Sequence, residues 1–258
     1  MNGLAISAGA AFTLWQRELT CFFRQPSRVA GAIGTPLVFW LFMGSGLAGS
    51  FRLPGAAGSG AGVSYLQFFF PGTIALVLLF AAIFSTLSVI EDRHEGFLQG
   101  VLVAPVSRGA IVAGKVLGGA TLAWLQGVVF LLLAPLAGIP LTLSSFLESA
   151  GVLALLAVSL TAIGFGFAWK VDSVQGFHAV MNVVLLPMWL LSGSFFPLAG
   201  APLWLGLLMR INPLTYGIAA LRGTLSAAPI AIPLAITVAM ALLAFAADLL
   251  VTRGGRVE

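Results

Sequence analysis

The sequence predicts an all-α integral membrane protein with six transmembrane helices, an N-terminal amphipathic interface helix and a re-entrant helical hairpin before the last span. Hydrophobic residues occupy 60% of the 258 positions and charged residues only 8%, whereas soluble domains carry about 25% charged residues. The mean hydropathy of +1.09 would leave apolar surface that a soluble fold cannot bury. At roughly 20 apolar residues per span, the chain has room for six crossings within one membrane domain.

Residues 8–25 predict an amphipathic helix that lies in the plane of the membrane interface. Phe12, Trp15, Leu19 and Phe22 recur at spacings of three and four, so they share one face, while the arginines fall elsewhere on the helical wheel. Aromatic residues on one face and arginines on another suit the interface better than the membrane interior. A helix that packs against its own protein is the alternative interpretation.

Six apolar segments follow, each long enough to cross roughly 30 Å of hydrocarbon. A Gly, Ala and Ser-rich loop, residues 52–67, separates the first two. Residues 197–229 are too apolar for a simple loop, yet Asn212-Pro213 splits them into pieces too short to span, which predicts a re-entrant hairpin on the outer side. The predicted spans are 30–50, 68–90, 112–136, 146–169, 177–196 and 230–251.

The distribution of lysine and arginine orients these spans. Nine of the 12 basic residues fall on the side that holds both termini, and three fall on the other side. The positive-inside rule therefore predicts a multi-pass protein of the cytoplasmic (inner) membrane with both termini in the cytoplasm. The net charge of +4 does not indicate nucleic-acid binding, because the basic residues are scattered singly and form no patch.

The sequence predicts no catalytic, cofactor-binding or metal site. It contains one cysteine and two histidines, His94 in a charged loop and His178 at the start of the fifth span, and its acidic residues lie near span ends. An ion-coupled carrier usually places ionisable residues at mid-membrane, so we expect another protein to supply the energy for transport. An ion-coupled carrier or channel, and a lipid-modifying membrane enzyme, remain the alternatives.

Residues 109–115 formally match the nucleotide-binding pattern GxxxxGK. Val116 stands where that pattern needs a Ser or Thr hydroxyl for magnesium, and the stretch opens an apolar helix, so we reject the match. The glycines here, Gly114, Gly118 and Gly119, are expected to permit close helix packing. Lys115 is expected to be an interfacial cation that reaches for headgroups or water.

A charged, glycine-broken island, EDRHEGFLQGVLVAPVSRG, spans residues 91–109 and holds five of the 20 formally charged residues. Its pattern predicts a short helix over residues 91–105 that carries an apolar stripe and a charged side. Such a helix can dock as a rigid knob on a cytoplasmic partner, which makes residues 91–109 the predicted coupling segment. An ordinary solvated loop between spans is the alternative.

Four motifs give the chain a resemblance to a known family: FFRQPSR, YLQFFFPG, EDRHEGFLQGVLVAPVSR and RINPLTYGIAALRG. With these motifs among six spans, the chain resembles the permease subunits of the ABC-2 type exporter family, which includes drug-resistance, nodulation-factor and polysaccharide export permeases. The resemblance implies a dimer with a second copy or a related permease, in contact with membrane lipid. It also implies a cytoplasmic ABC ATPase as partner, so that ATP is used by the partner subunit and no cofactor is bound by this chain.

The same resemblance implies three groups of functional residues, whereas the class of cargo is inferred from the composition of the spans, which leaves polysaccharide export as an alternative. The apolar spans favour a lipid-like, amphipathic or hydrophobic small-molecule substrate. Trp15 and Arg17 are expected to assist docking from the interface helix. The outer hairpin is expected to gate the pathway, or to anchor to headgroups, through Arg210, Asn212, Pro213, Tyr216 and Arg222. The residues expected to couple to the ATPase are Glu91, Arg93, Glu95, Gly96, Leu98, Leu102, Pro105 and Arg108.

Overall fold

The computed structural model describes residues 3–47 and 64–254, and every regular element within them is helical, which confirms the all-α part of the predicted fold class. The long helices are α1 (Gly3–Phe23), α2 (Pro26–Gly46), α3 (Tyr65–His94), α5 (Arg108–Leu131), α6 (Leu143–Lys170) and α11 (Ala231–Gly254). The short ones are α4 (Phe97–Val103), η1 (Ala134–Ala137), α7 (Val174–Val180), η2 (Met181–Leu185), α8 (Leu186–Trp189), η3 (Leu190–Ser194), α9 (Leu203–Ile211) and α10 (Pro213–Ser226).

Five helical stretches are long and apolar enough to cross a membrane: Tyr65–His94, Arg108–Leu131, Leu143–Lys170, Val174–Ser194 and Ala231–Thr252. The predicted first span, 30–50, corresponds to α2, whose apolar part Ala30–Gly46 is shorter than these five. Residues 48–50 and most of the predicted loop 52–67 lie outside the described residues. The sixth crossing therefore stays a prediction.

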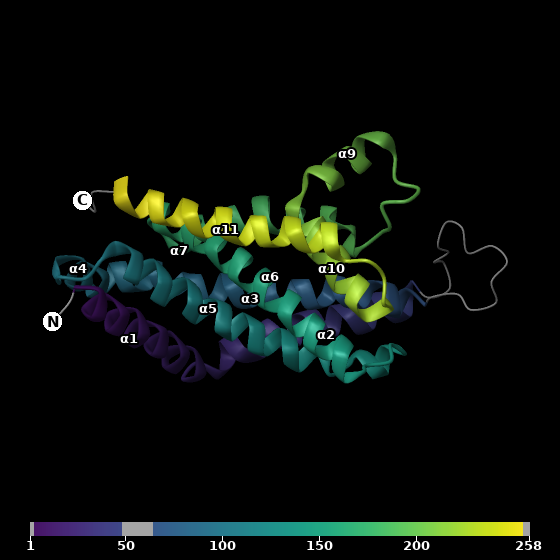
Figure 1. Cartoon of the computed structure of the whole chain (residues 1–258), viewed down its shortest axis with the longest axis horizontal. Coiled ribbons are helices and arrows are strands. Elements are labelled where there is room, and N and C mark those ends of the chain that lie inside the picture. Colours follow the sequence, from purple (N-terminus) through teal and green to yellow (C-terminus); the bar gives the residue numbers. More distant parts are fainter. Residues whose placement is uncertain (1–2, 48–63, 255–258) are drawn as a thin grey trace.

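Helix α3 forms the centre of the bundle, with α2, α5 and α6 packed around it (Figure 1). Its most apolar stretch of 18 residues is 83% buried inside the bundle. Aromatic rings fill the contact with its neighbours, since Trp40 of α2 packs edge-on against both Phe70 of α3 and Phe130 of α5. Helix α1 packs on α5, and α11 packs on α6. The most apolar window of α11 is only 22% buried, as expected for a lipid-facing helix.

The second, third and fifth spans differ from their predicted bounds, and the third, predicted at 112–136, is helix Arg108–Leu131 followed by the separate turn η1. Ser64 and Gln67 form a capping box that starts α3 at Tyr65, and the helix continues to His94 instead of ending at residue 90. The predicted fifth span, 177–196, is not one regular helix, because η2 and η3 are wide π-helical turns on either side of α8. Pro187 has no N–H to donate to the preceding turn, and Gly193 adopts φ +76°, which ends the regular helix.

The predicted outer hairpin contains two helices, α9 and α10, which Asn212-Pro213 separates as expected. The Asn212 side chain caps α10 by accepting a hydrogen bond from the Leu214 N–H at 3.0 Å. Its Nδ2 donates to the Met188 carbonyl at 2.6 Å, which ties the hairpin to the broken fifth span. Helix α9 projects away from the bundle (Figure 1). Whether the hairpin enters the membrane stays a prediction.

Candidate functional site

The coupling segment forms a tight corner between two long helices. The prediction of one helix over 91–105 was wrong in its bounds, because residues 91–94 are the last turn of α3 and a separate helix, α4, begins at Phe97. Gly96 makes this break with φ +77°, a conformation that a residue with a side chain rarely adopts. Ser107 then starts α5 by accepting a hydrogen bond from the Ala110 N–H. The corner therefore has a defined helical shape.

The short helix α4 has one face against the bundle and another in solvent. Leu98 is fully buried and Leu102 is half-buried, as the predicted apolar stripe requires, whereas Pro105, the last residue predicted for that stripe, is exposed. The exposed face, which we call the α4 outer face, consists of Glu95, Gln99, Gly100, Val103 and Pro105. Val103 is 87% exposed although it is apolar.

Arg93 attaches the end of α3 to the end of α6. Its Nη2 donates to the Trp169 carbonyl at 2.6 Å, and its Nη1 forms an ion pair with Asp172 at 2.9 Å. The last carbonyls of a helix lack partners within the helix, so a guanidinium there satisfies them. The side chain of Arg93 is only 14% exposed. The structure thus places this predicted coupling residue inside the corner, where it fixes the corner's position.

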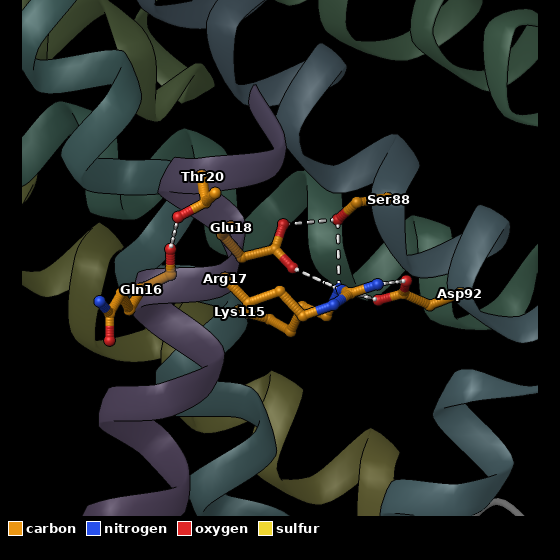
Figure 2. Close-up of polar contacts among 7 residues, drawn as sticks. All are labelled: Gln16, Arg17, Glu18, Thr20, Ser88, Asp92 and Lys115. Atoms are coloured by element: carbon orange, nitrogen blue, oxygen red, sulfur yellow. Dashed lines mark hydrogen bonds and ion pairs between the residues drawn. The ribbon is translucent and has the colours of Figure 1, made fainter. Parts of the chain in front are cut away.

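Figure 2 shows a cluster of buried charges, and its Arg17 also contacts Phe97 at the start of α4, so the cluster adjoins the corner. This charge cluster consists of Arg17 and Glu18 on α1, Ser88 and Asp92 on α3, and Lys115 on α5. The ammonium group of Lys115 donates to Glu18 Oε1 at 2.5 Å and also to Asp92. The guanidinium of Arg17 donates to both carboxylate oxygens of Asp92, at 2.8 and 2.6 Å, and Ser88 donates to Glu18 at 2.7 Å.

The charge cluster is balanced and largely shielded from solvent. Its two carboxylates face two cations, and the side chains of Lys115, Glu18 and Asp92 are at most 4% exposed. Buried charges that are paired and hydrogen-bonded are tolerated, whereas removal of one partner leaves an uncompensated charge and costs about 3–5 kcal/mol. The cluster is therefore a strong constraint on the relative positions of three helices.

Two glycines of α5 let α1 approach closely enough to reach these charges. A Cβ atom on Gly114 would lie 2.6 Å from the Cβ of Leu14, and one on Gly118 would lie 2.8 Å from the Cβ of Glu18. Both distances are too short for real atoms, so only glycine fits. The predicted role of these glycines in close packing is confirmed. Lys115 lies between them and points into the gap that they create.

The interface helix α1 also contacts α4 and α5 outside the charge cluster. The guanidinium of Arg17 lies 3.9 Å from the centre of the Phe97 ring, the first residue of α4. Trp15 donates from its indole N–H to the Thr121 hydroxyl of α5 at 3.1 Å. Trp15 and Arg17 thus lie on the same helix, and Arg17 connects α3 to α4. Their role in docking stays a prediction. Helix α1 packs against its own protein, the alternative left open by the sequence.

Three charged members of the cluster were missed by sequence reasoning. The expected role of Lys115 as a headgroup-seeking cation was wrong, because its side chain is buried between two carboxylates. Glu18 and Asp92 were not singled out at all. Their signal was weak but present: Ser88 and Asp92 are four residues apart and share one face of α3, and Lys115 stands between two glycines.

The predicted outer-hairpin residues lie at the opposite end of the bundle. The Tyr216 hydroxyl donates to the Arg210 carbonyl at 2.8 Å, which closes the turn between α9 and α10. Arg222 donates to the Phe68 and Gly193 carbonyls, at 3.3 and 3.1 Å. These bonds fasten α10 to the start of α3 and to the break in the fifth span. A cavity of about 580 Å³ lies beside Arg222 and is mostly apolar.

The chain is similar to a transporter family model and to several curated proteins, two of which are named as transport permeases. The family model of the ABC-2 type transporter matches residues 10–226. A putative transport permease ycf38 of Cyanophora paradoxa is 31% identical over 215 residues, which cover 82% of this chain and 72% of that protein. Nodulation protein J of Rhizobium leguminosarum bv. viciae is 26% identical, with 84% and 83% covered. The inner membrane transport permease YadH of Escherichia coli K12 is 29% identical, with 81% and 80% covered.

Proposed function

The chain belongs to the ABC-2 type transporter family, and from that premise we propose that it is the membrane-spanning permease subunit of an ATP-driven exporter. It is a multi-pass membrane protein of a family of transport permeases. In the proposed assembly, two copies of this chain, or this chain and a related permease, form the pathway between them. A separate cytoplasmic ABC ATPase binds and hydrolyses the ATP.

The observation that carries this proposal is the corner of α3, α4 and α5, which is exposed on its outer side and held by charges on its inner side. The α4 outer face offers the ATPase an acidic and apolar surface, with Glu95 and Val103 exposed. Behind it, Arg17 contacts both Phe97 and Asp92. A push on α4 is therefore transmitted to α1, α3 and α5 together, because these helices share the charge cluster.

The orientation that we propose places α4 in the cytoplasm. The start of α1 and the end of α11 lie on the same side of the bundle as α4, as Figure 1 shows. This arrangement agrees with the distribution of basic residues, most of which fall on that side of the sequence-based topology. Both termini are then cytoplasmic in the inner membrane, and α9 and α10 face the outside.

For the cargo we propose a lipid-like, amphipathic or hydrophobic small molecule. The apolar side chains of α2 that one copy leaves exposed, Val38, Leu41 and Phe42, provide a wall suited to such a molecule if a second copy faces them. The names of the relatives do not state which class of molecule they transport. Stimulation of ATP hydrolysis, measured against a panel of lipids, drugs and glycans, identifies the class.

A paired substitution in the coupling segment tests the proposed function. Glu91→Ala combined with Glu95→Ala is expected to abolish transport in vesicles reconstituted with the ATPase, while ATP hydrolysis and membrane insertion persist. Glu148→Ala, an exposed acid at the opposite end of the bundle, is the matched control and should keep transport. Wild-type transport by the paired variant would overturn the assignment of the corner as the coupling element.

A further inference from the structure

A small cavity lies between α6 and α11, on the side of the bundle that carries α4. Its volume is about 260 Å³, and most of its wall is apolar, including Ile163, Phe167 and Val251. Two side chains of opposite charge line the same cavity, Asp248 of α11 and Lys170, the last residue of α6. Neither belongs to the charge cluster behind the corner.

Asp248 is buried without a hydrogen-bond donor for one of its oxygens. The residue is 2% exposed, and its Oδ2 has no partner among the described residues. Gly166 makes the room for this carboxylate, since a Cβ at that position would lie 2.9 Å from Asp248 Oδ1. A buried carboxylate without a partner is costly. The site therefore favours a ligand that brings a cationic hydrogen-bond donor.

Lys170 supplies the opposite charge at the mouth of the cavity. It is exposed, and within the described part of the chain it forms no ion pair, either with Asp248 or with another acid. Gly166 and Lys170 are one helical turn apart, so they share the face of α6 that lines the cavity beside Asp248 of α11. Four residues of helix correspond to a rise of about 6 Å. The cavity thus presents a buried carboxyl group within and a cation near its edge.

We propose that this cavity binds the headgroup of a phospholipid that carries a primary amine, with the ammonium on Asp248 and the phosphate on Lys170. The apolar wall of Ile163, Phe167 and Val251 would receive the start of an acyl chain. Both charged residues lie within about two turns of the ends of their helices, which is the depth at which headgroups meet hydrocarbon. In the orientation proposed above, the lipid belongs to the inner leaflet.

Hydrogen-bond chemistry makes the site selective. A primary ammonium has three N–H donors and can satisfy both oxygens of a carboxylate. The trimethylammonium of a choline headgroup has none, so it would leave Asp248 Oδ2 without a donor. A glycerol headgroup brings no cation for the carboxylate. Ethanolamine lipids should therefore bind more tightly than choline or glycerol lipids with the same acyl chains.

The test measures lipid binding to the purified, delipidated full-length chain, by native mass spectrometry and by thermal unfolding in detergent. Phosphatidylethanolamine is expected to bind at least tenfold more tightly than phosphatidylcholine or phosphatidylglycerol of matched chains, and to raise the unfolding temperature. Asp248→Asn, which keeps the side-chain shape, should remove this preference. Glu148→Gln, an exposed acid at the other end of α6, should keep it.

Two further arms keep the proposal falsifiable. Lys170→Gln changes an exposed residue and leaves the fold intact, and it should weaken phosphatidylethanolamine binding severalfold. Soluble glycerophosphoethanolamine should bind at least tenfold more weakly than the lipid, because it lacks the acyl chains. Equal binding of ethanolamine and choline lipids, unchanged binding by Asp248→Asn, or equal binding of the soluble headgroup would each overturn the proposal. Because these measurements involve neither ATPase nor transport, they are independent of the proposed function.

Discussion

Lys115 lies at the centre of the charge cluster. It contacts Glu18 and Asp92, which lie 97 and 23 residues away in the chain, and Arg17 reaches the same Asp92 across 75 residues. Pairings at such separations leave no periodic pattern in the sequence. Arg17 was predicted to be functional because of its place on the interface helix. Its partner Asp92 could not be predicted, because no local pattern connects the two residues.

Removal of the Lys115 charge should destabilise the protein strongly. Lys115→Met keeps the length of the side chain but leaves two buried carboxylates facing Arg17 alone, a cost of about 3–5 kcal/mol. The midpoint of thermal unfolding in detergent should fall by on the order of 10 °C. Lys170→Met removes an exposed lysine and should change the midpoint little. Equal midpoints for the two variants would contradict the assigned role of the charge cluster.

A double-mutant cycle separates pairing from burial. Glu18→Gln should destabilise the protein, as should Lys115→Met, but the two changes together should cost less than their sum. Each single change strands a charge that the double change removes. Thermal unfolding of the four proteins gives the coupling between the two side chains. Strict additivity would show that Glu18 and Lys115 do not stabilise each other.

At the scale of elements, hydropathy predicted which helices exist better than where they end. Length and apolar composition were sufficient for the long helices α3, α5, α6 and α11. The end of α3 was misplaced because Asp92 and Arg93 read as loop residues by polarity, although inside the fold they bind Lys115 and the end of α6. The fifth span was predicted as regular because hydropathy does not detect the wide turns around Pro187.

The contact of α1 with α5 should depend on the absence of a side chain at Gly118. Gly118→Ala places a methyl group 2.8 Å from the Cβ of Glu18, which should separate the two helices and expose α1 to limited proteolysis. Gly151→Ala is the matched control, since nothing lies within 4 Å of its Cβ position in α6. That control should be neutral or slightly stabilising, because alanine favours helix over glycine by about 0.5–1 kcal/mol. Similar protease resistance in both variants would contradict the close-packing role of Gly118.

At the scale of the whole molecule, the end that holds α4 and the end that holds the α9–α10 hairpin are joined by the buried central helix α3. The charge cluster and α4 occupy one end, and the bonds of Arg222 to α3 and η3 occupy the other. Helix α3 contacts both sets directly, through Asp92 near its end and Phe68 near its start. We therefore expect a displacement of α4 to reach the α9–α10 hairpin through α3.

Thiol labelling tests the orientation of the whole molecule. Cys21 is the single cysteine, so Cys21→Ser gives a background without thiols. In intact cells, a membrane-impermeant maleimide should label Ser144→Cys but should label Gln99→Cys only after the membrane is opened. Both positions are exposed. Labelling of Gln99→Cys from outside would reverse the topology and remove the ATPase-docking role of α4.

The same Cys21→Ser background tests whether α2 crosses the membrane. Leu47 is exposed just after the end of α2. If α2 crosses the membrane, Leu47→Cys should react in intact cells as Ser144→Cys does. Protection of Leu47→Cys until the cells are opened would show that α2 does not cross the membrane and would overturn the six-span topology.

The close fit of α1 on α5 has a consequence for movement. Arg24 and Gln25 alone separate α1 from α2, while α1 cannot leave α5 without exposing Glu18 and Lys115. We therefore expect the chain to swivel at this two-residue hinge during the nucleotide cycle. Spin labels at Thr13 and Leu117, both exposed, should keep a constant separation from resting to ATP-bound protein, whereas labels at Thr13 and Leu41 should report a changed one.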